Sequence, residues 1–220
     1  DKEALPLLIQ MTKNTGSPIG RLHALWTLQG FGKLSSETIK QALKDKVPGI
    51  RENAIRLAEL HLDESSMTEA LLALQDDENI KVRYQLLLTL GFVDTPSVTV
   101  ARQAMLFKDI QNEWIQVAAL SATSFQGNDL LEAVLNRFEE DDSAYTSLVQ
   151  RLSAMIGRKG QPSEIRSLLK RAVNIESKKA YAWQAPVLKG LADGIKSNEL
   201  SNTDYRTEQT ALIKAFFQHP

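Results

Sequence analysis

A period of about 32 residues constrains the fold of this 220-residue chain more than any other feature of its sequence. The segment that begins at Asp45 aligns with the segment that begins at Asp77, so that Asp falls on Asp and Arg51 falls on Arg83. The apolar core positions of successive repeats are then spaced by 30, 32 and 32 residues, at Ala24, Ala54, Leu86 and Ala118. Repeats of this length are typical of solenoids, because one unit cannot bury its apolar face alone.

Each repeat predicts two short helices. Apolar residues recur at three- and four-residue steps, as at Ile39, Ala42 and Leu43, which places them on one helical face. Serines such as Ser35 and prolines such as Pro18 mark helix starts, and Pro186 is expected to kink the helix that contains it. The expected helices span residues 2–13, 18–30, 35–44, 49–62, 66–75, 80–92, 97–107, 111–125, 128–140, 143–157, 162–174, 179–195 and 205–218.

Stacking such hairpins predicts the all-α class and, within it, an α-α superhelix: a right-handed, HEAT/armadillo-like solenoid of about five to six helical hairpins. We expect residues 1–220 to form a single solenoid domain, with regular repeats over 1–125 and divergent repeats over 126–220. The chain begins with Asp1 rather than Met and ends abruptly at His219–Pro220. This predicts a segment excised from a longer, multi-domain protein.

The recurring aspartate and arginine predict a structural ladder. Asp45 and Asp77 fall in turns between helices, where each is expected to cap the second helix of its hairpin. Arg21, Arg51 and Arg83 fall in the first turn of that helix, from which a guanidinium can reach the turn carboxylate of a neighbouring repeat. Repetition favours a scaffolding role over a catalytic one. The ladder should lapse in the fourth repeat, where Ile115 takes the arginine position.

The charge balance argues against several classes of partner. Lys and Arg total 26 against 27 for Asp and Glu, so the net charge gives no support to nucleic-acid binding. No run of eighteen apolar residues occurs, which predicts no direct membrane insertion. Residues 109–150 carry one base and eight acids, whereas 151–196 carry ten bases and three acids. The second stretch contains a candidate patch for an anionic partner, made of Arg151, Arg158, Lys159, Arg166, Lys170 and Arg171.

The sequence predicts no catalytic, cofactor-binding or metal-binding residues. With 0 Cys, disulfides and thiolate metal sites are excluded. His23, His61 and His219 are scattered and lack the spacing of a helical zinc site. The acidic run over residues 139–142 lacks the alternate ligand spacing and the turn glycine of a calcium loop. We therefore do not expect this chain to be an enzyme.

The repeated Asp and Arg resemble those of HEAT repeats, over residues 15–125. Three strings carry a narrower resemblance: GRLHALWTLQGFG over 20–32, VPGIRENAIRLAE over 47–59 and VRYQLLLTLG over 82–91. They are similar to the HEAT segment of large bacterial membrane-associated dehydrogenase-like proteins. That resemblance implies a β-propeller before the segment, a c-type cytochrome domain after it, and a periplasmic or cell-envelope location. No Cys-x-x-Cys-His motif occurs in this chain, so any haem would belong to that further domain.

The resulting expectation is a non-catalytic scaffold or protein-interaction module of a larger exported dehydrogenase-like protein that also carries a cytochrome c domain. Its partners would be another protein or neighbouring domains of the same chain. One alternative is a free-standing protein that binds an acidic partner through the basic patch. A second is a HEAT-like DNA glycosylase, a resemblance that implies a catalytic Asp on the helical face of a tryptophan. Here Trp114 is followed four residues on by Ala118, so that carboxylate is missing.

Overall fold

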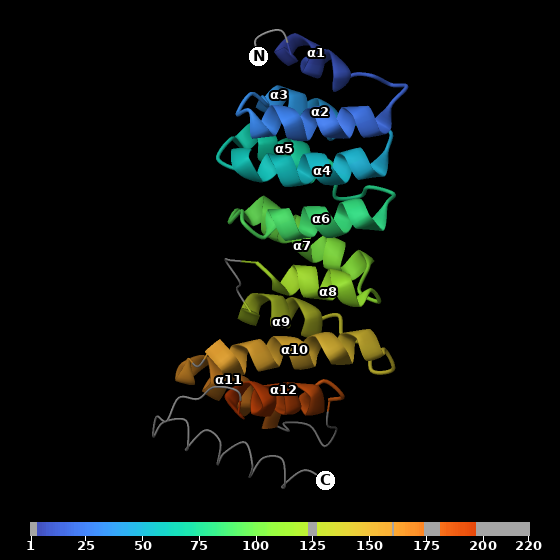
Figure 1. Ribbon diagram of the computed structural model, residues 1–220. Coiled ribbons are helices and arrows are strands. Elements are labelled where there is room, and N and C mark those ends of the chain that lie inside the picture. Colours follow the sequence, from blue (N-terminus) through green and yellow to red (C-terminus); the bar gives the residue numbers. More distant parts are fainter. Residues whose placement is uncertain (1–3, 123–126, 160, 174–180, 197–220) are drawn as a thin grey trace. The chain divides into compact units, whose positions relative to one another are not determined.

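The computed structural model describes residues 4–122, 127–159, 161–173 and 181–196. Over these residues the chain folds into α-helices without strands, which confirms the all-α class. The helix predicted at 205–218 lies outside the described residues. The twelve α-helices of the described part are Ala4–Met11 (α1), Pro18–Gly30 (α2), Ser36–Ala42 (α3), Pro48–Ala58 (α4), Ser65–Leu72 (α5), Ile80–Leu90 (α6), Pro96–Lys108 (α7), Glu113–Leu120 (α8), Gly127–Leu135 (α9), Ser143–Lys159 (α10), Pro162–Val173 (α11) and Gln184–Lys196 (α12) (Figure 1).

Side-chain caps and prolines set where several of these helices begin. The Ser17 hydroxyl accepts a hydrogen bond from the Gly20 backbone N–H, and Pro18 occupies the first turn of α2, where no N–H is needed. Ser35 caps α3 in the same way, through the backbone N–H of Thr38 at 3.2 Å. These starts fix the phase of each helix, and with it which side chains face the core.

The contacts divide the chain into two compact units. Unit 1 comprises Asp1–Asp109 and Trp114–Ser124, and unit 2 comprises Ile110–Glu113 and Phe125–Pro220. The division falls where the sequence repeat blurs, near residue 125. The single continuous solenoid over residues 1–220 stays a prediction.

In unit 1, helices that follow one another in the sequence pack against one another. The second helix of each hairpin packs on the next, α2 on α4 and α4 on α6, while α3 packs on both α4 and α5 (Figure 1). All four repeat positions, Ala24, Ala54, Leu86 and Ala118, are at most 2% exposed. The repeat frame therefore identified the core of unit 1 correctly, as expected when each hairpin buries its apolar stripe against its neighbours.

In unit 2, α10 and α12 cross at very short range. A Cβ atom placed on Gly194 would lie 2.1 Å from the backbone oxygen of Ala154, and one on Gly190 would lie 2.2 Å from that of Gln150. From the other helix, a Cβ on Gly157 would lie 2.9 Å from the Leu191 oxygen. Only glycine permits this approach of two backbones.

Pro186 does not kink a helix. The prediction of a kink was wrong because α12 begins at Gln184, which leaves Pro186 in the first turn. The backbone N–H groups of a first turn have no partner within the helix, so a proline there removes no helical hydrogen bond.

Among the described residues, no helix combines the length and apolar character that crossing a lipid bilayer requires.

Candidate functional site

The structure brings the ladder residues of unit 1 together. The Arg51 guanidinium donates two hydrogen bonds to the Asp77 carboxylate, at 2.7 and 2.8 Å. Arg21 binds Asp45 in the same bidentate way, and Arg83 binds Asp109. Each arginine thus reaches the turn carboxylate of the following repeat, and a bidentate ion pair joins each of these neighbouring hairpins.

A third hydrogen bond ties each arginine to its own repeat. Nη1 of Arg51 donates to the backbone oxygen of Asp45 at 2.8 Å, and Nη1 of Arg83 donates to that of Asp77 at 2.6 Å. The aspartates do not cap the helices directly, contrary to the prediction. Instead Asp45 accepts the backbone N–H of Val47, and Val47 is the residue that precedes α4. The aspartate therefore closes the turn through Oδ1, which also accepts Nη2 of Arg21, while its Oδ2 accepts Nε of the same arginine.

The ladder lapses where the sequence predicts. Ile115 is buried and has no charge to offer a carboxylate. In unit 2 the equivalent aspartate, Asp142, accepts the backbone N–H of Ala144, as Asp45 accepts that of Val47. Its other oxygen accepts a hydrogen bond from the side-chain amide of Gln111. The turn closed by Asp142 is therefore retained, although Ile115 takes the place of the arginine that would bind this carboxylate.

The central ion pair shifts the pKa of both partners. Burial alone would raise the pKa of Asp77, but hydrogen bonds from Arg51 and from the Asn79 backbone N–H, with the charge of Arg51, lower it on balance. The same hydrogen bond raises the pKa of Arg51 against the effect of burial. Hydrogen bonding to Asp109 likewise raises the pKa of Arg83.

Acid should weaken unit 1 through Asp77. Because the pKa of this carboxyl is lower in the folded than in the unfolded chain, its ion pair stabilises the fold fully above the unfolded value. That contribution is lost as the pH falls through the folded pKa. We expect Asp77→Asn to be less stable than the parent at pH 7, with a difference that narrows below about pH 4. Urea unfolding from pH 3 to pH 7 measures it, and a difference that stays constant over this range would contradict the assignment.

A second set of side-chain hydrogen bonds joins the second helices near their outer surface, and one of its acceptors, Gln85, is itself buried. The Trp26 indole N–H on α2 donates to Asn53 on α4 at 3.0 Å. Arg56 on α4 donates to Gln85 on α6 at 2.8 Å. Trp26 and Arg56 occupy the same position of the repeat, as do Asn53 and Gln85. The period therefore generates two parallel ladders, one in the turns and one on this surface.

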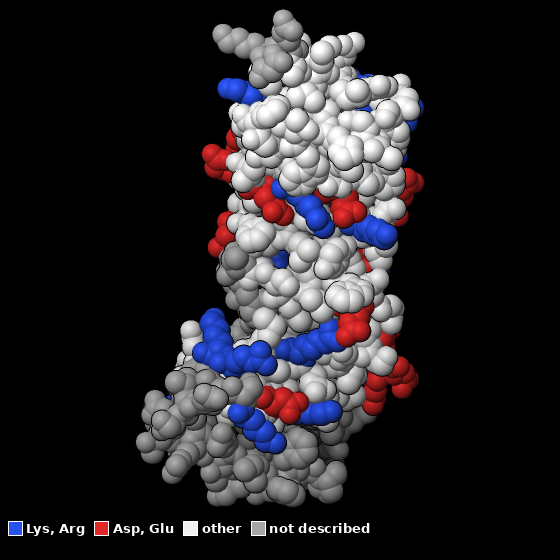
Figure 2. Space-filling view, in the orientation of Figure 1, with Lys and Arg blue, Asp and Glu red and all other residues white. Residues whose placement is uncertain are grey.

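We call this surface the second-helix face. It combines exposed apolar side chains with charges of both signs. Ile19 is 70% exposed, Trp26 43% and Trp114 69%. Figure 2 shows an uncharged surface over α2, followed by a row of acidic and basic side chains over α4 and α6. The members of the face are Ile19, His23 and Trp26 on α2, Glu52, Asn53 and Arg56 on α4, Lys81, Tyr84 and Leu88 on α6, and Trp114 and Val117 on α8.

Individual residues of the second-helix face were not predicted from the sequence. Trp26 lies among the core residues Ala24, Leu25 and Leu28, and its type alone is typical of a core side chain. The signal that identifies it is the repeat frame, which places the charged Arg56 at the same position. A position that holds tryptophan in one repeat and arginine in the next is expected to be at the surface.

The basic patch of unit 2 is interspersed with acids. Arg151 on α10 pairs with Glu113, and Arg171 on α11 pairs with Glu132. Arg171 also lies over the ring of Trp183, 5.5 Å from its centre. Lys159 lines a pocket of about 220 Å³ together with the acids Asp129 and Glu164.

The other predicted bases, Arg158, Arg166 and Lys170, are exposed on the ends and outer faces of α10 and α11. Their field is reduced by these neighbouring carboxylates. Binding of an acidic partner at this patch stays a prediction.

The described residues hold no cluster of three or more His, Cys, Asp or Glu in an arrangement that fits a metal ion. His61 and Glu64 form a pair at 3.0 Å, and the Ser36 hydroxyl also hydrogen-bonds Glu64. These hydrogen bonds, first that of Ser36 and then that of His61, lower the pKa of Glu64.

Comparison with known proteins finds no family model and no curated protein that matches the chain.

Proposed function

We propose that unit 1 is a non-catalytic protein-interaction module that binds a polypeptide segment across the second-helix face. The observation that carries this proposal is that Trp26 is both exposed and held in place. The residue is 43% exposed, while its indole N–H donates a hydrogen bond to Asn53. A large aromatic side chain with little freedom left to lose is the kind of residue that dominates binding energy at protein interfaces.

The partner is defined by the other side chains of the second-helix face. Ile19 and Trp114 offer apolar contact area, and Arg56 and Glu52, which form an ion pair with each other at 3.6 Å, offer one charge of each sign. The side chain of Arg56 remains 52% exposed. We therefore propose a polypeptide segment in which apolar side chains alternate with acidic and basic ones. A polyanion would meet too few bases on this face.

A peptide library displayed on phage tests this proposal with the full 220-residue chain as bait. We expect enriched peptides that bind in the micromolar range and lose at least tenfold in affinity with Trp26→Ala or Trp114→Ala. Val100→Ala is the matched control, because Val100 is 67% exposed on α7, a first helix. Isothermal titration of one selected peptide against the three variants gives the comparison.

Two outcomes would overturn the proposal. One is the failure of any peptide to be enriched over an unrelated bait. The other is a set of peptides whose affinity falls with Val100→Ala and not with the two tryptophan variants. Circular dichroism of each variant, expected to match the parent, separates loss of binding from loss of fold.

We also propose, from the sequence resemblance alone, that this module belongs to a larger exported dehydrogenase-like protein. Its neighbouring domains would then supply both the redox chemistry and the polypeptide that is bound. Reading the coding sequence on both sides tests this context. A propeller upstream and a Cys-x-x-Cys-His motif downstream would support it, and an unrelated pair of neighbours would contradict it.

A further inference from the structure

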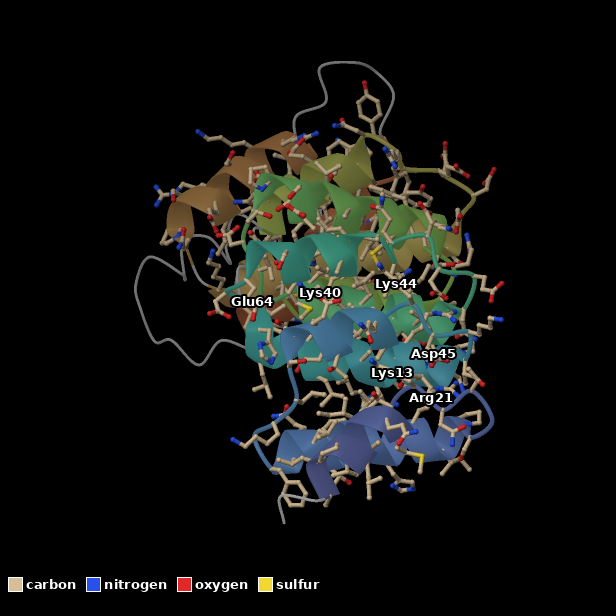
Figure 3. All side chains as sticks on the ribbon, turned by 90° about the horizontal axis from the view of Figure 1, so that it is seen from above. Lys13, Arg21, Lys40, Lys44, Asp45 and Glu64 are labelled. Carbon is tan, nitrogen blue, oxygen red and sulfur yellow. The ribbon has the colours of Figure 1, made fainter. Side chains whose placement is uncertain are left out.

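A pocket of about 500 Å³ opens between the first two hairpins of unit 1. It lies where α1 and α3 end and where α2 and α4 begin. In Figure 3, Lys13, Arg21 and Asp45 lie toward one side of the view, whereas Lys40 on α3 and Glu64, which precedes α5, lie toward the other side. The lining residues are Thr12, Lys13, Thr15, Pro18, Arg21, Thr38, Gln41, Ala42, Lys44, Asp45, Lys46 and Val47.

Three ammonium groups in this lining have no partner among the described residues. Lys13, Lys44 and Lys46 are exposed, and within the described part of the chain their side chains form neither a hydrogen bond nor an ion pair. Lys40, which lies on α3 four residues before Lys44, differs, because its ammonium contacts Ser66 and Glu37. The pocket is therefore lined by three positive charges that no ion pair within the described residues neutralises.

Asp45, the acidic residue in the lining of the pocket, already has hydrogen-bond partners. Asp45 accepts two hydrogen bonds from Arg21 and one from the backbone N–H of Val47. The carboxylate and the guanidinium cancel each other, and the three lysines set the local charge. No other acidic side chain lines the pocket within the described residues.

Backbone groups at two helix N-termini add to the positive electrostatic potential in the pocket. The first turns of α2 and α4, which begin at Pro18 and Pro48, carry the partial positive charge of helix N-termini. The carbonyls at the opposite ends of α1 and α3 are capped, since Met11 and Ala42 accept backbone hydrogen bonds from Asn14 and Asp45. These hydrogen bonds reduce the negative partial charge in the pocket, while the cap on α2 occupies one N–H, that of Gly20, through the Ser17 hydroxyl.

We propose that this pocket binds a phosphate group, either free or as a phosphomonoester. Three ammonium groups more than balance the two charges of a phosphate dianion. The Thr15 hydroxyl, and that of Thr38, which also pairs with the Ser35 hydroxyl, supply further polar contacts of the kind a phosphate oxygen accepts. The volume accommodates the phosphate with a small attached group. The site is separate from the second-helix face, so each can fail without the other.

The test uses the full chain with inorganic phosphate and with O-phosphoserine as probes, at constant ionic strength. We expect saturable binding by isothermal titration, and a loss of at least tenfold in affinity with the combined change Lys13→Gln, Lys44→Gln and Lys46→Gln. The matched control is Lys33→Gln, Lys189→Gln and Lys196→Gln. It removes the same charge at exposed positions outside the pocket and should keep the parent affinity.

The two probes distinguish free phosphate from a phosphomonoester as the ligand. Tighter binding of O-phosphoserine identifies an ester as the ligand, and tighter binding of inorganic phosphate identifies the free ion. Absence of saturable binding by either probe, or an equal loss in the two triple variants, would overturn the proposal. An equal loss would mean that the net charge of the chain, not the pocket, attracts the anion.

Discussion

Replacing Gly194 by alanine is expected to destabilise unit 2 by about 3 kcal/mol, because among the glycines in the described part of the chain its added Cβ would lie nearest to another atom. The added Cβ would lie 2.1 Å from the Ala154 backbone oxygen and 3.0 Å from its Cα. These are backbone atoms in the middle of α10, so no side chain can rotate away. Relief requires α12 to move away from α10 along their whole contact.

Trp183 provides the measurement. It lies just before α12, and neither Trp26 nor Trp114 is in unit 2, so its fluorescence in a Trp26→Phe, Trp114→Phe background follows that unit. We expect the urea midpoint of Gly194→Ala to fall sharply, with Gly190→Ala close behind it because its Cβ would lie 2.2 Å from a backbone oxygen.

Gly49→Ala is the control for the intrinsic effect of the methyl group. Gly49 lies in α4 and a Cβ placed on it meets nothing within 4 Å. Alanine favours a helix more than glycine does, so this change should stabilise unit 1 by up to about 1 kcal/mol. If Gly194→Ala were as harmless as Gly49→Ala, the close crossing of α10 and α12 would be wrong.

This crossing could not be predicted from the repeat. Repeat detection depends on successive units that keep the same residues at the same positions, and beyond residue 125 these positions diverge. Gly190 and Gly194 are four apart, which puts them on one face of a helix. That spacing predicts a flat face and does not identify the helix that covers it. In the folded protein this face packs against Ser153 and Gly157 of α10.

The turn ladder could be predicted because each of its contacts is repeated. A single Asp and Arg six residues apart would have had many interpretations, but Asp45 with Arg51 and Asp77 with Arg83 share one. The period did not specify whether each arginine binds the aspartate of the preceding or of the following repeat. The structure shows that each arginine reaches forward, Arg51 to Asp77 and Arg83 to Asp109.

The lysine pocket could not be predicted, because its residues come from four separate helix ends. Lys13 and Lys44 are 31 residues apart and belong to no motif. Each follows the end of a helix, where a basic residue is explained by the helix dipole alone. Their convergence depends on the packing of the first hairpin against the second, which a single sequence does not specify.

Removing Arg51 is expected to destabilise unit 1 by about 3–5 kcal/mol, because it leaves the Asp77 carboxylate buried without a cation. The two side chains are 9% and 5% exposed. Lys108→Ala is the matched control. Lys108 pairs at 2.8 Å with Asp76, the residue next to Asp77, but there the carboxylate is 77% exposed. Its loss should change the unfolding free energy by less than about 1 kcal/mol.

A double-mutant cycle then separates the ion pair from the rest of the fold. Arg51→Met combined with Asp77→Leu is expected to be more stable than either single variant, since removing both charges leaves neither one unpaired in the interior. Urea unfolding of the four proteins at pH 7 gives the coupling energy. Additive effects would mean that the two side chains act independently, and the turn ladder would then not be what joins the hairpins. If the ladder is only structural, a peptide selected on the second-helix face should bind Arg51→Ala, under conditions where that variant is folded, with the parent affinity.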